Sequence, residues 1–218
     1  MASRNTDYVF GRKMDRKQIA TIYFRNKKEN IGEDAWDVSE QQNGSVMAWI
    51  KWEFTGASLY IAANGPVTAN RNCSCLFYGY KNLLNIFHLR FLQTDRTENM
   101  HHMFGKCSSL ITLDLSSFDT SWVEDMGYMF AECESLKTLD ISSFDLSQIH
   151  KYGSDSFLDK TGLSDLQQVS VKQPENLWPS VVRELAELGE SCYQLEQEKM
   201  DIRACKRHGI PLFESELQ

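Results

Sequence analysis

A stretch that occurs twice decides the fold: MFGKCSSLITLDLSSFDTSWVEDMGY, starting at Met103, and MFAECESLKTLDISSFDLSQIHKYGS, starting at Met129. The two copies are 26 residues apart and share apolar residues at most positions of their first halves. These shared positions are Phe104/Phe130, Cys107/Cys133, Leu110/Leu136, Leu113/Leu139, Leu115/Ile141 and Phe118/Phe144. A period of this length is typical of proteins built by stacking one repeated unit.

Two weaker copies flank this pair. The upstream copy carries Phe77, Leu83, Ile86 and Phe91 in the matching places, with one extra residue before Met103. The downstream copy is truncated and keeps Phe157, Leu163 and Leu166, with Val169 one residue out of step. We therefore expect about four rungs, which is enough for a stable stack because such arrays need roughly three.

Each unit changes its rhythm halfway along. Leu113 and Leu115 alternate as the inward side chains of a short strand would. Ser121 and Glu124 then have the spacing of a helix capping box, and a following set of apolar residues falls at helical spacing. This set is Val123, Met126, Met129 and Phe130. A strand followed by a helical turn, stacked on its neighbours, predicts an α/β fold, a short right-handed leucine-rich-repeat solenoid.

The two ends of such a stack need caps. On the N-terminal side, residues 19–24, 46–52 and 59–63 read as strands, and we expect Trp36, Trp49 and Trp52 to form the core of a β-rich cap. On the C-terminal side, residues 179–208 place an apolar stripe at helical spacing, with Gly209 and Pro211 as stop signals. The predicted organisation is a basic arm and cap over 1–72, the repeats over 73–171, and an amphipathic helix with a tail over 172–218.

The segments SSLITLDLSSFDTSWVEDMGYMF and ESLKTLDISSFDLSQ resemble the repeat of BspA-like leucine-rich-repeat proteins, the DUF285 family. The upstream segments DAWDVSEQQNGSVMAWI and SLYIAANGPVTAN are similar to the cap that commonly precedes these repeats. The resemblance covers roughly residues 15 to 171 and leaves out the C-terminal helix. It implies a binding role, since family members are typically bacterial surface proteins implicated in adhesion.

The outward positions of the predicted strands form the candidate partner-binding face. Because neighbouring strands lie about 4.8 Å apart, Asp114 and Asp140 should stand side by side with like charges. That arrangement favours a cationic ligand, although a repeated sequence also repeats its aspartates without any ligand. His88 and Arg90 depart from the repeat pattern in the first copy and are added as candidates. The full set is Thr112, Asp114, Ser116, Thr138, Asp140, Ser142, His88 and Arg90.

Composition and motifs restrict the chemistry. A net charge of -7 argues against nucleic acid or an anionic membrane as the partner, so we expect a basic or neutral protein. No phosphate loop, nucleophile elbow or HExxH motif is present, and no catalytic residue is assigned. Cys73-x-Cys75 and Cys205-x-x-His208 each supply two ligands, whereas a structural zinc site needs four. We therefore expect no enzyme, no cofactor and no metal.

The leading hypothesis is a non-enzymatic protein-binding module that uses the strand face, the C-terminal helix, or both. A homodimer formed through that helix is an open alternative. The sequence as given lacks an export signal and a membrane span, which predicts a cytoplasmic protein unless it reaches the surface by other means. Three alternatives remain. The first is a phage or mobile-element inhibitor that occludes a basic site on a host or defence protein, the second is a bacterial surface adhesin, and the third is an enzyme or metal protein that uses the cysteine and histidine clusters.

Overall fold

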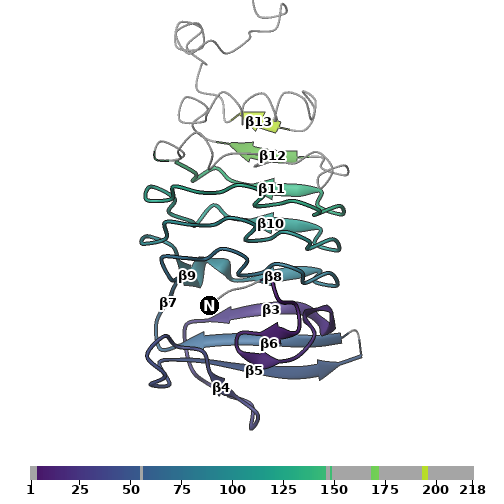
Figure 1. The fold of residues 1–218 in the computed structure, drawn as a ribbon, viewed down its shortest axis with the longest axis vertical. Coiled ribbons are helices and arrows are strands. Elements are labelled where there is room, and N and C mark those ends of the chain that lie inside the picture. Colours follow the sequence, from purple (N-terminus) through teal and green to yellow (C-terminus); the bar gives the residue numbers. More distant parts are fainter. Residues whose placement is uncertain (1–3, 55, 146–147, 149–167, 172–192, 196–218) are drawn as a thin grey trace, which may run out of the picture.

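The computed structural model describes residues 4–54, 56–145, 148, 168–171 and 193–195. In this part of the chain, β-rich rungs stack on an N-terminal sheet (Figure 1). The helical pieces among the described residues are two three-residue 3₁₀ turns, η1 (Arg16–Gln18) and η2 (Leu89–Phe91). The molecule is therefore built almost entirely from strands and turns.

The N-terminal sheet has five strands in the order β4-β5-β6-β3-β8. Strands β5 and β6 pair antiparallel, whereas β3 runs parallel to both β6 and β8. Because β8 comes from the first repeat copy, this sheet leads directly into the repeats. The strands are β3 (Ile19–Arg25), β4 (Trp36–Asp37), β5 (Val46–Glu53), β6 (Gly56–Ala63) and β8 (Asn85–Phe87).

The remaining strands are short. A parallel sheet runs in the order β10 (Thr112–Asp114), β11 (Thr138–Asp140), β12 (Gln168–Val171) and β13 (Tyr193–Leu195). Two small pairs complete the fold: β1 (Tyr8–Val9) with β2 (Arg12–Lys13), and β7 (Val67–Thr68) with β9 (Leu92–Gln93). In Figure 1, β8, β10, β11, β12 and β13 follow one another up the stack.

The second half of each rung is an extended arc. Its amides bond to the next rung: the N–H of Phe77 donates to the carbonyl of Met103 at 2.8 Å, and that of Phe104 to Met129 at 2.9 Å. The arc also turns at two left-handed residues in each rung, and these recur in register. The columns are Cys75, His102 and Tyr128, then Gly79, Lys106 and Glu132.

The predicted α/β leucine-rich-repeat solenoid is therefore wrong. The helical turn expected between Thr120 and Phe130 is absent, because its amides bond to neighbouring rungs or close short turns instead of bonding four residues back. Ser121 likewise forms no capping box, since its hydroxyl donates to the Asp119 carboxylate. The apolar spacing that suggested a helix is satisfied by an arc with two sharp turns.

The C-terminal amphipathic helix is not supported either. Tyr193–Leu195, at the centre of its predicted range, form strand β13, which pairs with β12 through Val169–Tyr193 and Val171–Leu195. The rest of that range lies outside the described residues. The open alternative of a homodimer through this segment would therefore have to use a strand, and not a helix, at these three positions.

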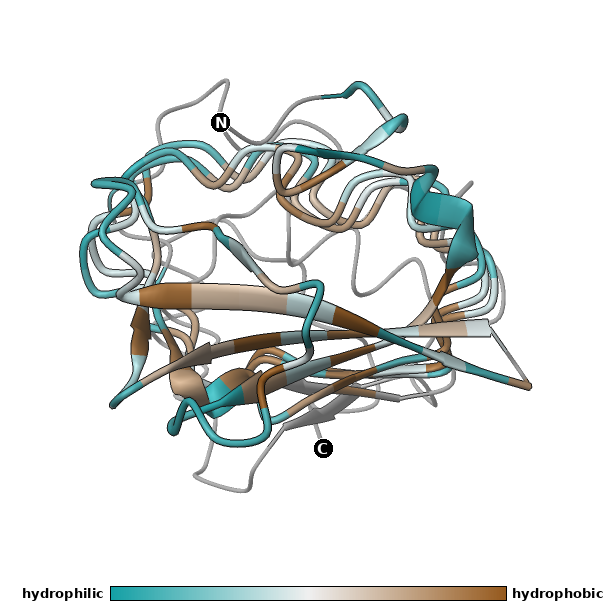
Figure 2. Ribbon diagram, turned by 90° about the horizontal axis from the view of Figure 1, so that it is seen from below, coloured by the Kyte–Doolittle hydropathy of each residue, from teal (hydrophilic) through white to brown (hydrophobic). Residues whose placement is uncertain are grey.

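The core runs through the stack without a break. Apolar side chains of the N-terminal sheet and of the repeats belong to one buried cluster that extends from Val9 to Val169. Three buried rings mark its axis: the centroids of Phe77 and Phe104 are 5.3 Å apart, and those of Phe104 and Phe130 are 5.9 Å apart. Figure 2, viewed along the stack, shows the strands on one side and the arcs of the rungs opposite.

The tryptophans do not form the predicted cap core. Trp49 is buried, but in a separate cluster with Tyr60 on the outward side of the sheet. Trp36 is half-buried and packs against the main core, and its indole N–H donates to the carbonyl of Phe10. Trp52 is 67% exposed, so this part of the prediction is wrong. It lies at the end of β5, beyond the reach of the core.

A buried arginine connects the N-terminal segment to the first rung. The Arg16 guanidinium donates to the carbonyls of Tyr8, Cys75 and Tyr78 and lies over the ring of Tyr80. The carbonyl of Tyr78 has no preceding rung to supply a donor, whereas its equivalent in the next rung, Gly105, accepts from the N–H of Gly79, so the Arg16 side chain takes the place of that missing donor.

Candidate partner-binding face

The outward side of the strands is one continuous surface that changes character along the stack. Equivalent outward positions on β5, β6, β3 and β8 carry Trp49, Tyr60, Tyr23 and Phe87, as their strand registers show. Each ring stacks on the next, with centroids 5.3, 4.9 and 4.9 Å apart. This row, which we call the aromatic row, becomes more exposed toward the repeats, from buried Trp49 to Phe87 at 40%.

The repeats continue the same line with carboxylates. Asp114 and Asp140 are register partners on β10 and β11, as expected from the repeat. They correspond to Phe87, because the first rung is offset by one extra residue: Ile111 N–H bonds to Leu84 just as Lys137 N–H bonds to Ile111. An exposed ring therefore adjoins two like charges on neighbouring strands.

Hydrogen bonds give these aspartates a structural role as well. Oδ1 of Asp114 accepts from both the N–H and the hydroxyl of Ser116, at 3.0 and 2.6 Å. Asp140 accepts in the same way from the N–H of Ser142. Such local bonds fix the turn after each strand, so the repetition of aspartate has a cause independent of any ligand.

The predicted site residues are only partly brought together. Thr112, Asp114 and Ser116 are exposed, whereas Thr138, Asp140 and Ser142 are half-buried. His88 is exposed in a left-handed conformation, although its counterpart Leu115 is buried, and it precedes η2. Arg90 lies over the ring of Phe91. His88 and Arg90 thus belong to the turn after β8 and not to the strand line itself.

Two cations lie beside the aromatic row. The Arg25 guanidinium is 4.7 Å from the ring centroid of Tyr60 and 5.8 Å from that of Trp49, and the Lys51 ammonium is 5.4 Å from Tyr60. Cations over ring faces are attracted electrostatically. The outward surface is therefore cationic and aromatic near the N-terminal sheet and acidic on the repeats.

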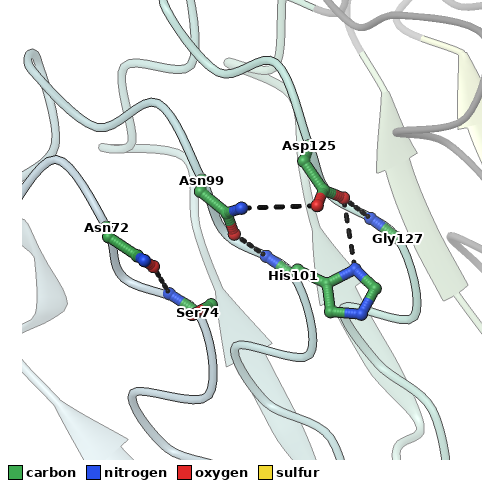
Figure 3. Close-up of polar contacts among 6 residues, drawn as sticks. All are labelled: Asn72, Ser74, Asn99, His101, Asp125 and Gly127. Carbon is green, nitrogen blue, oxygen red and sulfur yellow. Dashed lines mark hydrogen bonds and ion pairs between the residues drawn. The ribbon is translucent and has the colours of Figure 1, made fainter. Parts of the chain in front are cut away.

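A second polar column follows the arcs, where Asn72, Asn99 and Asp125 occupy one position in three rungs (Figure 3). Each accepts from the N–H two residues later, in Ser74, His101 and Gly127 respectively. Asn99 also donates to Asp125, and Nδ1 of His101 lies 3.2 Å from Asp125 Oδ1. Sequence reasoning missed this column, although aligning the copies with the extra residue allowed for would have revealed it.

The column holds the arcs in register rather than forming a reaction centre. Asp125 is committed to three partners within the chain. Among the described residues no group of three or more histidine, cysteine, aspartate or glutamate side chains is placed to hold a metal ion. The neighbouring His102 is uncharged at neutral pH, because partial burial and the nearby His101 lower its pKa to about 4.

The buried cysteines are poor nucleophiles. Burial raises the pKa of Cys107 well above its ordinary value and that of Cys133 to about 12, so both thiols stay protonated at neutral pH. Each donates to the carbonyl of a residue in the preceding rung, Cys107 to Phe77 and Cys133 to Phe104. Their chemistry is that of small core residues with one satisfied donor.

Comparisons with known proteins agree with the repeat. No helix in the described part of the chain has the length and apolar character needed to cross a membrane. No curated protein and no solved structure gives a significant match. Residues 71–177 match the family described as "Mycoplasma protein of unknown function, DUF285". The repeat region of this chain is therefore similar to the DUF285 family over these residues.

Proposed function

We propose that this chain is a non-enzymatic module that binds a basic or neutral protein through the outward face of β8, β10 and β11. The observation that carries the proposal is the adjacency of Asp114 and Asp140, exposed and half-buried respectively, on register-paired strands beside the exposed ring of Phe87. Like charges on neighbouring strands cost stability in the free protein, and a cationic partner offsets that cost.

Rigidity of the face supports the same conclusion. The strands that carry these side chains are short, but their backbones are fixed by bonds between rungs: Leu115 N–H donates to Asp140, and Lys137 N–H to Ile111. A surface that is ordered before binding loses little conformational entropy when the partner arrives. Aromatic side chains such as Phe87 are enriched in protein interfaces relative to the rest of the surface.

The test compares two double variants with the same change in charge. Asp114→Lys with Asp140→Lys alters the face, whereas Glu124→Lys with Glu134→Lys alters two exposed glutamates outside it. Each immobilised full-length protein is used to capture partners from bacterial extract and from host extract, and candidate affinities are then measured by calorimetry. We expect a basic or neutral partner that is retained by the wild type and the glutamate variant and weakened at least about tenfold by the aspartate variant.

Equal retention of every partner by the aspartate variant would contradict the proposal. Affinity that is unchanged in molar salt would contradict its electrostatic part, since exposed charges are screened under that condition. The identity of the captured partner also separates the inhibitor hypothesis from the adhesin hypothesis, because the first requires an intracellular target and the second a host surface protein.

A further inference from the structure

Strand β5 has an open edge. Its neighbour β6 pairs with all eight of its residues, but β4 on the other side reaches only Met47 and Ala48. Among the described residues, no strand pairs with Ile50–Glu53 on that side. Figure 1 shows β5 near the base of the stack, at the end farthest from the repeats. An open strand edge is a ready template for another strand.

The backbone at this edge is oriented for pairing. The carbonyl of Val46 accepts from Val38, on the side of β4, and in a strand every second residue points its N–H and C=O the same way. Ile50 and Trp52 therefore direct both groups toward the open side. Large apolar side chains accompany them, since Trp52 is 67% exposed and the following Phe54 is fully exposed.

The residues along the edge are ordered so that the segment complements itself. Residues 50–54 read IKWEF. In an antiparallel pairing of two copies centred on Trp52, Lys51 of each copy stands opposite Glu53 of the other. Ile50, whose side chain is buried in its own core, stands opposite Phe54, the turn residue that follows β5. Every directly opposed pair is then either apolar or of opposite charge, which is the arrangement that stabilises cross-strand neighbours.

We propose that β5 is the homodimer interface of this protein, formed by antiparallel pairing of Ile50–Phe54 with the same segment of a second copy. The two five-stranded sheets join edge to edge across a two-fold axis that passes by Trp52. Symmetric, self-complementary contacts of this kind are the usual basis of dimers. The surface lies on β5, away from the strand face of the repeats, and does not depend on the proposed function.

Sedimentation velocity on the full-length protein over a hundredfold range of concentration gives the first test. The wild type should shift from monomer to dimer. Trp52→Lys should remain monomeric, whereas Trp122→Lys, which changes a tryptophan of matching 66% exposure in the repeats, should dimerise like the wild type. A wild type that stays monomeric over the whole range, or variants that behave alike, would overturn the proposal.

Charge exchange tests the register. Lys51→Glu and Glu53→Lys should each weaken self-association at least about tenfold, because both pairs formed by residues 51 and 53 then carry like charges. Mixing the two variants should restore a dimer containing one copy of each, as should combining both changes in one chain. Failure of the mixture to form that heterodimer would refute the pairing centred on Trp52, even if the wild type dimerises.

Discussion

The N-terminal sheet and the repeat sheet use the same outward line of positions in opposite ways. In the first, long strands such as β5 and β6 carry rings that stack across strands, with Tyr23 between Tyr60 and Phe87. In the repeats, three-residue strands carry threonine and aspartate at those positions. Long strands are stabilised by cross-strand packing, whereas short strands depend on what holds the rest of the rung.

What holds the rungs is a set of repeated columns. Buried rings stack along the axis, hydroxyls of Thr94 and Thr120 bridge neighbouring rungs, and the Asn72, Asn99 and Asp125 column fixes the arcs. Because these contacts hold the rungs together, the outward strand side chains of the repeats are not needed for packing. The difference explains why the candidate binding residues lie on the repeats and the structural rings on the N-terminal sheet.

The largest effect should come from the axial rings. Phe104 is fully buried between Phe77 and Phe130, so Phe104→Ala should lower the free energy of unfolding by about 3 to 5 kcal/mol in urea denaturation. Tyr23→Ala, in the half-buried aromatic row, serves as the comparison and should cost clearly less. If both variants lost the same free energy of unfolding, the buried rings of the repeats would be no more important for stability than the outward rings of the N-terminal sheet.

A smaller loss is expected from the bridging hydroxyl of Thr120. It donates to the carbonyl of Asp145 and accepts from the N–H of the same residue, and it is buried. Thr120→Val should therefore cost about 1 to 3 kcal/mol, measured by thermal and urea unfolding. The matched change Thr112→Val, at an exposed strand position, should be nearly neutral. If Thr120→Val left the free energy of unfolding unchanged, the bridging hydroxyls would not contribute to the stability of the stack.

His102 should make the repeats sensitive to acid. Its folded pKa is lowered from 6.5 to about 4, mainly by burial, so between these values the unfolded chain binds a proton that the folded chain does not. The contribution of neutral His102 to the free energy of unfolding is therefore complete above pH 6.5 and is lost as the pH falls toward 4. His102→Asn keeps a residue suited to the left-handed conformation and should reduce the stability difference between pH 7 and pH 5.

His88→Asn is the matched control, because it replaces an exposed left-handed histidine with the same residue. Urea midpoints at the two pH values should differ as much in this variant as in the wild type. An unchanged pH dependence in His102→Asn would show that this histidine does not couple to folding.

The smallest effect concerns the paired aspartates. Asp114→Asn keeps an oxygen that can accept from Ser116 but removes the like charge opposite Asp140. We expect a gain of about 0.2 to 1 kcal/mol at low salt that disappears at high salt. Asp119→Asn, which also has a serine partner but does not lie on the strand face, should show no such gain. A loss in Asp114→Asn would mean that the turn needs the full carboxylate.

The sequence predicted the longest strands of the fold and the register of the repeats. The repeat predicted the Asp114 to Asp140 register, and the predicted strands 19–24, 46–52 and 59–63 lie within β3, β5 and β6. The prediction of a helix in place of the arc was wrong because apolar residues such as Met126, Met129 and Phe130 would face inward at the same spacing in an arc and in a helix. An arc and a helix with this apolar spacing differ in which carbonyls accept from their backbone amides. The local sequence does not determine which carbonyls these are.

The candidate site was predictable only where it repeats. Asp114 and its neighbours follow from the pattern. The aromatic row takes one ring from each of four strands, of which β3 and β8 are distant in sequence from the β5–β6 pair, so finding it required the strand order of the sheet. Trp52 was misplaced because periodicity shows which side of a strand a residue faces but not where the core ends. Its exposure suggests the role in dimerisation that we propose for this edge.

Amide hydrogen exchange at single-residue resolution tests most directly whether the rungs are joined by backbone bonds. The amides of Phe77, His102 and Phe104, which donate to the next rung, should exchange slowly, and the amide of the exposed Trp122, for which no such bond is found, should exchange fast. Uniform slow exchange across 121–130 together with a helical circular dichroism spectrum would contradict the account and restore a helical turn to each rung.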